Sequence, residues 1–159
     1  MLKNKNAVIY GAGGSIGGAV ARAFAREGAN VFLSGRTIEP LEIIAKEIRA
    51  AGGTAETAIV DALDEKAIND YTDAVIKKTG SIDISYTAIA VEDVQGIPLT
   101  EMKLEDFTKP ISIAMKTQFL TAKAAGRHMI KKGSGVILSI TATPAGTACP
   151  VGRWFWPGM

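Results

Sequence analysis

Short apolar runs alternate with amphipathic stretches along most of the chain. Stretches of about 10–15 residues, with apolar residues three and four positions apart, are typical of helices. Strands that alternate with such helices favour right-handed βαβ units and a parallel sheet. The pattern predicts an α/β fold with a doubly wound parallel sheet of five strands in the order 3-2-1-4-5, in three layers α/β/α. The strands are expected at 6–10, 30–34, 54–60, 82–90 and 135–141.

Apolar residues at helical spacing predict which face of each helix packs on the sheet. For the first helix, which Gly28 should end, this face is Ile16, Ala19, Val20, Ala23 and Phe24. For the second helix it is Leu41, Ile44, Ala45 and Ile48. For the third helix, which Asp64 should cap, it is Ala67, Tyr71, Ala74 and Val75.

A longer helical region is predicted at about 101–132. Pro110 lies inside it, and a proline removes a backbone donor, so we expect it to divide the region into a short helix and a long one. The pairs Lys77–Lys78 and Lys131–Lys132 lie where helices should end. Positive charges at the C-terminus of a helix complement its dipole. These lysines therefore give no argument for a negatively charged binding partner.

Composition narrows the class of protein. The 159 residues suggest one domain, and 47% hydrophobic with 21% charged residues is ordinary for a soluble globular protein. A net charge of +2 gives no argument for nucleic acid or a membrane as partner. The single cysteine, Cys149, cannot form an internal disulfide, so we expect a reducing, cytoplasmic location. We identify no set of metal-binding residues.

A glycine-rich stretch, "VIYGAGGSIGGAV", follows the first predicted strand and opens the first helix. Gly11 can form the tight turn, Gly13 leaves the backbone bare for a phosphate, and Gly17 lets the helix approach the sheet. The helix N-terminus supplies free N–H groups and positive dipole for a pyrophosphate. A tight turn without a ligand is the alternative. The expected cofactor-binding turn comprises Gly11, Gly13, Gly14, Ser15, Ile16 and Gly17.

The end of the second strand points to the kind of dinucleotide. An acidic residue usually meets a free ribose 2′-hydroxyl there, but this chain has "SGRT", residues 34–37. Arg36 is a fixed cation with bidentate geometry for phosphate, which favours NADP over NAD. An exposed arginine at a strand end is the alternative. Asp61, after the third strand, can accept a hydrogen bond from the adenine amino group, or serve only as a turn or cap residue.

These features together resemble the short-chain dehydrogenase/reductase family over residues 3–146. The resemblance implies a Rossmann-like dinucleotide-binding domain and an NADP-dependent oxidoreductase that transfers hydride to or from a carbonyl or alcohol. In the family's glycine pattern G-x-x-x-G-x-G, Gly11 and Gly17 match. Ser15 replaces the middle glycine and can still cap the helix or contact phosphate. The motifs that carry the resemblance are "YGAGGSIGGA", "LSGR", "VDALD", "IDISYTAIA" and "GSGVILSITATPAG".

The catalytic positions of the family are substituted here. No tyrosine in the chain is followed four residues later by lysine, the pair that manages the proton during hydride transfer in this family. The family's asparagine on the long helix falls on Ala114. Its serine falls on Ala142, with Thr141 as a candidate remnant hydroxyl. Its asparagine-alanine-glycine run is 87–90, where Ala88 and Ala90 should border the cofactor and Ala90 adds a methyl group.

The last residues, 144–159, have no periodic apolar face and contain three prolines, so we expect an irregular tail after a domain at 1–143. A complete fold of this type has about six strands. We therefore interpret the tail as the result of truncation or a changed reading frame. A natural tail that covers the edge of the fifth strand is the alternative.

Three functions follow from these expectations. The first is the family's oxidoreductase activity, which we expect to be lost in this chain. A small carbonyl or alcohol substrate is expected only for a longer form. The second is a non-catalytic NADP-binding module, and the third is a fragment without function. The long helix from Ile111 to Lys132 is a candidate surface for a homo-oligomer.

Overall fold

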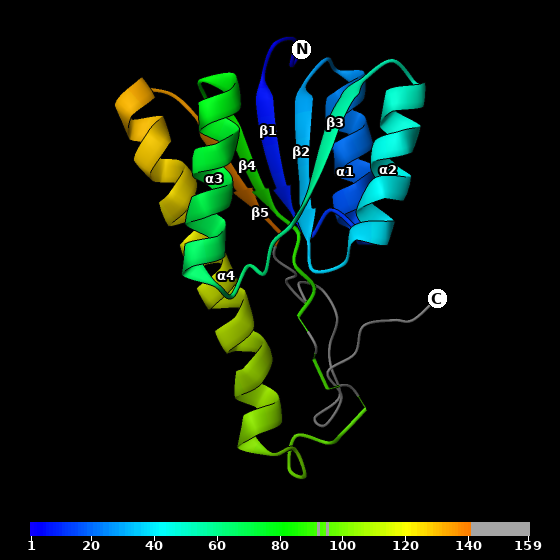
Figure 1. Ribbon diagram of the computed structural model, residues 1–159. Coiled ribbons are helices and arrows are strands. Elements are labelled where there is room, and N and C mark those ends of the chain that lie inside the picture. The colour runs from blue at the N-terminus through cyan, green and yellow to red at the C-terminus, as the bar shows by residue number, and fades with distance from the viewer. Residues whose placement is uncertain (92, 95, 141–159) are drawn as a thin grey trace.

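The computed structural model of the chain describes residues 1–91, 93–94 and 96–140. It contains one sheet of five strands, all paired in parallel, in the order β3-β2-β1-β4-β5 (Figure 1). The predicted fold class and strand order are confirmed. The elements are β1 (Asn6–Tyr10), α1 (Ser15–Arg26), β2 (Asn30–Gly35), α2 (Ile38–Ala50), β3 (Thr54–Ile59), α3 (Glu65–Thr79), β4 (Ile84–Thr87), α4 (Leu104–Lys132) and β5 (Val136–Ser139).

Two hydrophobic cores lie on the two faces of the sheet. Helices α1 and α2 cover one face, and α3 and α4 cover the other (Figure 1). Successive side chains of a strand point to opposite faces, so β1 contributes to both cores: Ile9 packs toward α1 and α2, and Val8 and Tyr10 toward α3 and α4. All five residues of β1 are buried, as expected for a central strand of a parallel sheet.

The predicted helix faces are right for α2 and partly wrong for α1. Leu41, Ile44, Ala45 and Ile48 are all buried, as predicted. In α1 the buried residues are instead Gly17, Gly18, Ala21 and Ala25, and Ile16 is 55% exposed. A side chain at Gly17 would overlap the carbonyl of Gly11. Helix α1 therefore approaches the sheet through its smallest residues, which a count of large apolar side chains does not detect.

Helix α3 begins as predicted. The side chain of Asp64 accepts hydrogen bonds from the backbone N–H groups of Lys66 and Ala67, at 2.8 and 3.2 Å. The buried residues of α3 are Ile68, Thr72 and Val75, whereas Ala74 is exposed. The predicted face was therefore right for Val75 and wrong for Ala74.

Pro110 does not divide α4, so that prediction was wrong. The helix is continuous from Leu104 to Lys132 with Pro110 inside it. A proline leaves the carbonyl four residues earlier, here that of Asp106, without its helical donor. Leu104, Glu105 and Phe107 around it are exposed, so water can solvate that carbonyl. None of the described helices is long and apolar enough to cross a membrane.

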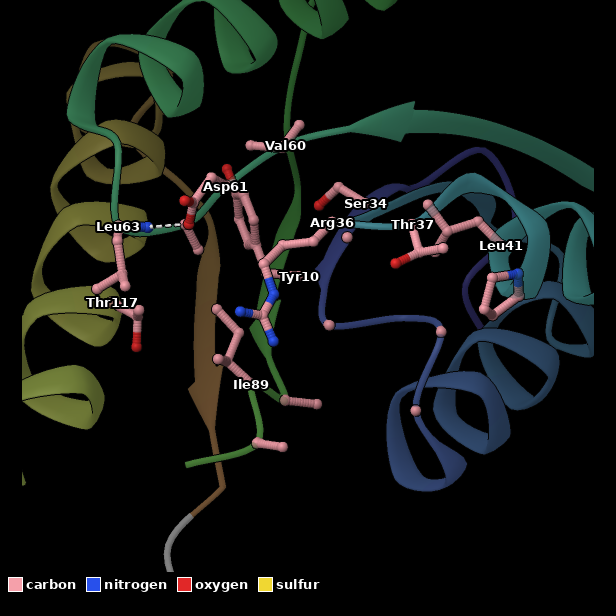
Figure 2. A pocket seen from close by; sticks show the side chains of 18 of the residues that line it. Tyr10, Ser34, Arg36, Thr37, Leu41, Val60, Asp61, Leu63, Ile89 and Thr117 are labelled. Carbon is pink, nitrogen blue, oxygen red and sulfur yellow. Dashed lines mark hydrogen bonds between the residues drawn. The ribbon is translucent and has the colours of Figure 1, made fainter. Parts of the chain in front are cut away.

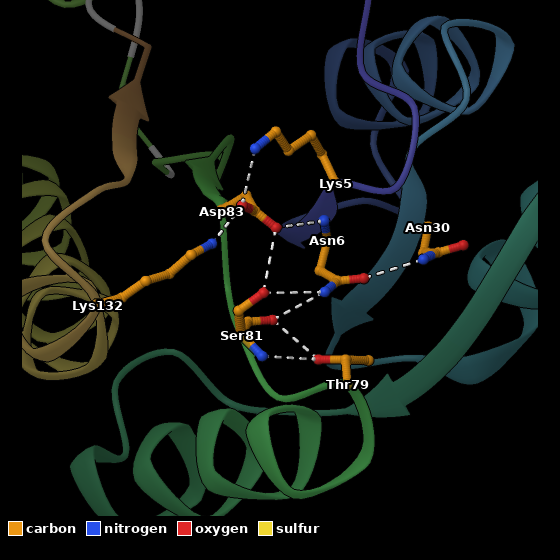
Figure 3. Close-up of polar contacts among 7 residues, drawn as sticks. All are labelled: Lys5, Asn6, Asn30, Thr79, Ser81, Asp83 and Lys132. Carbon is orange, nitrogen blue, oxygen red and sulfur yellow. Dashed lines mark hydrogen bonds and ion pairs between the residues drawn. The ribbon is translucent and has the colours of Figure 1, made fainter.

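A charged cluster joins the amino ends of β1 and β4 to the end of α4 (Figure 3). Asp83, 8% exposed, accepts hydrogen bonds from the backbone N–H of Asn6 at 2.9 Å and from Nζ of Lys132 at 2.5 Å. Nζ of Lys5 lies 3.4 Å from the same carboxylate. Burial raises the pKa of Asp83, but the hydrogen bonds from Lys132 and Asn6 outweigh it and hold the pKa below its usual value.

Candidate functional site

An open cavity of about 290 Å³ lies at the carboxyl ends of β1, β2, β3 and β4 (Figure 2). The chain proceeds from β1 toward β2 and β3 on one side, and β4 and β5 lie on the other. The strand order therefore reverses between β1 and β4. In open α/β sheets, ligands bind at such a reversal point, outside the carboxyl ends of the strands.

The glycine turn after β1 is fixed between the ends of β2 and β4. The N–H groups of Gly11 and Ala12 donate to the carbonyl oxygen of Ser34, at 2.9 and 3.1 Å. Gly11 has φ of 74°, and a side chain there would overlap the carbonyl of Ala88. Only glycine suits that position. Gly13 and Gly14 are exposed and line the cavity.

The start of α1 lies beside this turn. Gly14 is the N-cap residue, and no side chain caps the helix. Ser15 is the first helical residue, so it does not take the capping role considered for it. Ser15, Ile16 and Gly17 do not line the cavity. The first N–H groups of α1 nevertheless have no acceptor within the helix, and such groups favour an anion.

Arg36 and Asp61 line the cavity from two different strand ends. Figure 2 shows the side chain of Arg36 extending across the cavity toward Ile89. Oδ1 of Asp61 accepts a hydrogen bond from the N–H of Leu63 at 2.9 Å, so Asp61 forms a turn and borders the cavity at once. Asp61 is the only carboxylate among the described lining residues, and none lies at the end of β2.

The fourth strand and α4 supply the remaining wall. Ala88, Ile89 and Ala90 follow β4 and line the cavity, as do Ile113 and Thr117 of α4. Oγ1 of Thr117 donates to the carbonyl of Ile113 at 2.8 Å. The sequence places Ala114 of this helix at the site but does not identify Ile113 or Thr117. Ile113 and Thr117 are one helical turn apart, on the same side of α4.

Tyr10 is a further lining residue that the sequence reasoning missed. It is 1% exposed, and its hydroxyl has no hydrogen-bond partner among the described residues. Its ring meets that of Tyr71 edge to face, with centroids 6.0 Å apart. Burial raises the pKa of Tyr10 well above its ordinary value, so this hydroxyl stays protonated and is a hydrogen-bond donor. A tyrosine directly before the glycine turn was the available signal.

The catalytic positions implied by the resemblance are only partly described. Ala114 is half-buried in α4 and provides no polar group there. Thr141 and the expected tail at 144–159 lie outside the described residues. The described cavity therefore presents a glycine turn, the guanidinium of Arg36 and the carboxylate of Asp61, but no group that the resemblance assigns to proton transfer.

The family model for short chain dehydrogenases matches residues 5–153. The chain belongs to the short-chain dehydrogenase/reductase family. Gluconate 5-dehydrogenase of Gluconobacter oxydans (strain 621H) is 32% identical over 149 residues, which are 94% of this chain and 57% of that protein. Hydroxysteroid dehydrogenase-like protein 2 of Danio rerio is 35% identical over 140 residues, 84% of this chain and 33% of that protein. The chain thus spans about half the length, or less, of these curated relatives.

Solved structures of the family agree with the fold. A metagenomic short-chain oxidoreductase in complex with NADP superposes with a TM-score of 0.82 at 31% identity, covering 96% of this chain and 68% of that one. A xylitol dehydrogenase with bound NAD⁺ superposes with a TM-score of 0.81 at 30% identity, covering 96% and 58%. This chain thus has the NAD(P)-binding Rossmann fold of an oxidoreductase family. Because these two relatives hold different dinucleotides, family membership does not decide between them.

Proposed function

We propose that this chain binds NADP(H) in preference to NAD(H) at the cavity described above. The observation that carries the proposal is Arg36, which lines the cavity beyond β2 where no carboxylate is present. A carboxylate there would hydrogen-bond a free ribose 2′-hydroxyl and repel a 2′-phosphate. A guanidinium instead presents a fixed charge and a planar pair of donors that match a phosphate.

The other lining residues have matching roles in this proposal. Gly11, Gly13 and Gly14 of the turn line the cavity and would bind the pyrophosphate, and the dipole of α1 directly behind them favours its charge. Asp61 accepts a hydrogen bond from the adenine amino group, and Ala88 and Ala90 border the cofactor. When bound, the dinucleotide would supply a hydride in its reduced form or accept one in its oxidised form. The residues that would hold or move a proton in this family are substituted, so we propose cofactor binding without turnover for this chain.

The first test is a calorimetric titration of NADP⁺ and NAD⁺ into the wild type and Arg36→Ala. We expect the wild type to bind NADP⁺ about ten- to hundredfold more tightly, because a charge-assisted contact contributes about 1.5–3 kcal/mol. Arg36→Ala should lose this preference and leave the affinity for NAD⁺ unchanged. Arg26→Ala, an exposed arginine outside the cavity, is the matched control. Equal affinities in the wild type would contradict the proposal.

We also propose that two copies of the chain associate through α4. Ile111, Met115, Phe119 and Ile130 are 48, 57, 63 and 82% exposed, and their spacing places them in a row along one side of the helix. The four residues of strand β5 are exposed as well, and exposed apolar surface of this kind is typical of an interface between subunits. Light scattering should show that Phe119→Glu lowers the apparent mass, while Ile43→Glu, at an exposed isoleucine of α2, does not. A monomeric wild type would refute this association.

A further inference from the structure

The two edges of the described sheet differ in how their backbone is protected. Strand β3 forms one edge and β5 forms the other (Figure 1). At β3, Nη1 of Arg49 donates to the carbonyl oxygen of Ala55 at 3.1 Å, and Glu56 pairs with Lys78 at 2.7 Å. Charged side chains on an edge strand discourage another strand from pairing with it. The β3 edge is therefore blocked by side chains of its own chain.

Strand β5 lacks this protection within the part of the chain that the structure describes. No strand lies beyond it there, and no charged side chain is hydrogen-bonded to its backbone. Residues 133–140 contain neither a charge nor a proline, and Val136, Ile137 and Leu138 are 50, 45 and 43% exposed. A run that is apolar on both faces is typical of a strand with neighbours around it. The composition of β5 thus suits a partner strand.

The hydrogen bonds to β4 determine which backbone groups of β5 point outward. The N–H group of Val136 donates to the carbonyl oxygen of Asp83 at 2.9 Å, and that of Ile140 donates to β4 at 3.3 Å. Alternate residues of an edge strand bond to its neighbour, so Ile137 and Ser139 direct their N–H and C=O groups away from the sheet. These two residues offer a donor and an acceptor each to an incoming strand.

We propose that β5 pairs with β5 of a second copy of the chain, in an antiparallel arrangement around a twofold axis. The axis passes between Leu138 and the partner's Leu138. Ile137 then lies opposite the partner's Ser139, and the two residues exchange both of their hydrogen bonds, as in a hydrogen-bonded antiparallel pair. The same holds for Ser139 and the partner's Ile137. The two sheets become one continuous sheet.

Three properties of β5 favour a second copy over a different partner. Apolar segments of high β-propensity, low charge and no proline pair readily with identical segments. The antiparallel arrangement also places Lys131 and Lys132 of the two copies at opposite ends of the paired strands, whereas a parallel one would bring these positive charges side by side. A twofold contact finally satisfies both exposed edges at once and closes the assembly.

Disulfide cross-linking tests the register of this pair. Opposite residues of a non-hydrogen-bonded antiparallel pair have Cα atoms about 4.5 Å apart, a distance that a disulfide spans. In a Cys149→Ser background with oxidised glutathione, Leu138→Cys should form covalent dimers at least about tenfold faster than Ile59→Cys, because pairing raises the effective thiol concentration to roughly millimolar. Ile59, 66% exposed on β3, is the matched control. Equal rates would overturn the proposal.

Ser139→Pro tests the hydrogen bonds between the copies. Proline removes the outward N–H of Ser139 and is tolerated on an edge strand, so the bonds to β4 stay in place. In a Phe119→Glu background, analytical ultracentrifugation should give a dissociation constant about ten- to hundredfold higher, because half of the hydrogen bonds between the copies are lost. Thr57→Pro on the β3 edge should leave it unchanged. An unaltered dissociation constant for Ser139→Pro would contradict the pairing.

The outcomes separate this inference from the association through α4, on which it does not depend. If Phe119→Glu lowers the apparent mass but Leu138→Cys reacts no faster than its control, the contact through α4 stands and the pairing of β5 fails. Rapid cross-linking of Leu138→Cys that persists with Phe119→Glu supports the pairing, whatever the role of α4. Slow hydrogen exchange of the Ile137 N–H in a monomeric wild type would show that another segment of the same chain covers the edge, and it would overturn the proposal.

Discussion

Two glycines of the same turn have different roles. A side chain at Gly13 would point into the cavity region and meet Cβ of Pro40 at 3.1 Å, a contact that a small shift relieves. A side chain at Gly17 would overlap the carbonyl of Gly11 and approach Cα of Ala12 to 2.9 Å. The backbone of Gly11 and Ala12 cannot move away from such a side chain without displacing the turn. A side chain at position 13 is thus compatible with the fold but would occupy the proposed phosphate site. A side chain at position 17 would disturb the fold itself.

We predict that Gly13→Val weakens nucleotide binding at least tenfold and leaves the fold intact, because its branched side chain fills the space for the phosphate. Gly17→Ala should lower the free energy of unfolding by about 1–3 kcal/mol, the usual cost of forcing atoms into a packed interior. For a protein of this size this corresponds to roughly 2–4 °C in Tm per kcal/mol. Calorimetry and thermal denaturation measure both effects. Undiminished binding by Gly13→Val would mean that the loop is only a turn.

The sequence predicts some of the residues that line the cavity and not others. Arg36, Asp61, Ala88 and Ala90 follow three different strands, and they lie together because carboxyl ends of parallel strands meet at one edge of a sheet. Ile113 and Thr117 could not be placed in this way. Which residues of α4 face the cavity depends on how the whole helix packs against the sheet. The sequence pattern alone does not determine this packing.

Among the elements, helix faces were predictable where the packed residues are large. In α2 the periodic leucine and isoleucines are the buried residues, whereas in α1 glycine and alanine make the closest approach. The predicted strand at 82–90 was too long, because residues 88–90 leave the sheet to form the cavity wall. Local pattern therefore determines where an element lies more reliably than where it ends.

The Asp83 cluster leads to a prediction about acid stability. Because its pKa is lowered on folding, Asp83 stabilises the fold fully above its unfolded pKa of about 3.9, and this contribution is lost as the pH falls through the lower folded pKa. Asp83→Asn should cost about 1.5–3 kcal/mol at pH 7 through lost charge-assisted hydrogen bonds. The difference from wild type should shrink below about pH 4.

Urea denaturation at a series of pH values measures this difference. Asp70→Asn is the matched control, since Asp70 forms an exposed pair with Lys66 at 2.5 Å and such pairs contribute only about 0–1 kcal/mol. A gap between wild type and Asp83→Asn that is as large at pH 3 as at pH 7 would show that Asp83 acts through shape and not through charge.

At the scale of the whole molecule, the strand order and the two helical layers were predictable because βαβ units have one hand. The position of the cavity follows from the same order, since it lies where the order reverses. The catalytic apparatus is a different matter. It depends on particular side chains, and this sequence has alanine at the position that the family resemblance assigns to an asparagine on the long helix.

We therefore predict no measurable dehydrogenase turnover from this chain, even when it is saturated with NADPH. The reason is chemical, since no group is assigned to the proton that accompanies hydride transfer. The test mixes purified protein with NADPH and each of a panel of ketones and aldehydes. The absorbance of NADPH is then followed for a period long enough to detect slow oxidation. Sustained oxidation that depends on both protein and carbonyl compound would overturn the prediction.

The cavity and the Asp83 cluster occupy opposite ends of the same strands. With five residues in β1 and a rise of about 3.3 Å per residue, these ends lie farther apart than the roughly 7–10 Å beyond which substitutions usually act additively. The amino end of the sheet is therefore the place to attach a dye or a surface linker. A sensor for adenine nucleotides immobilised at that end would keep its recognition edge turned toward the solution.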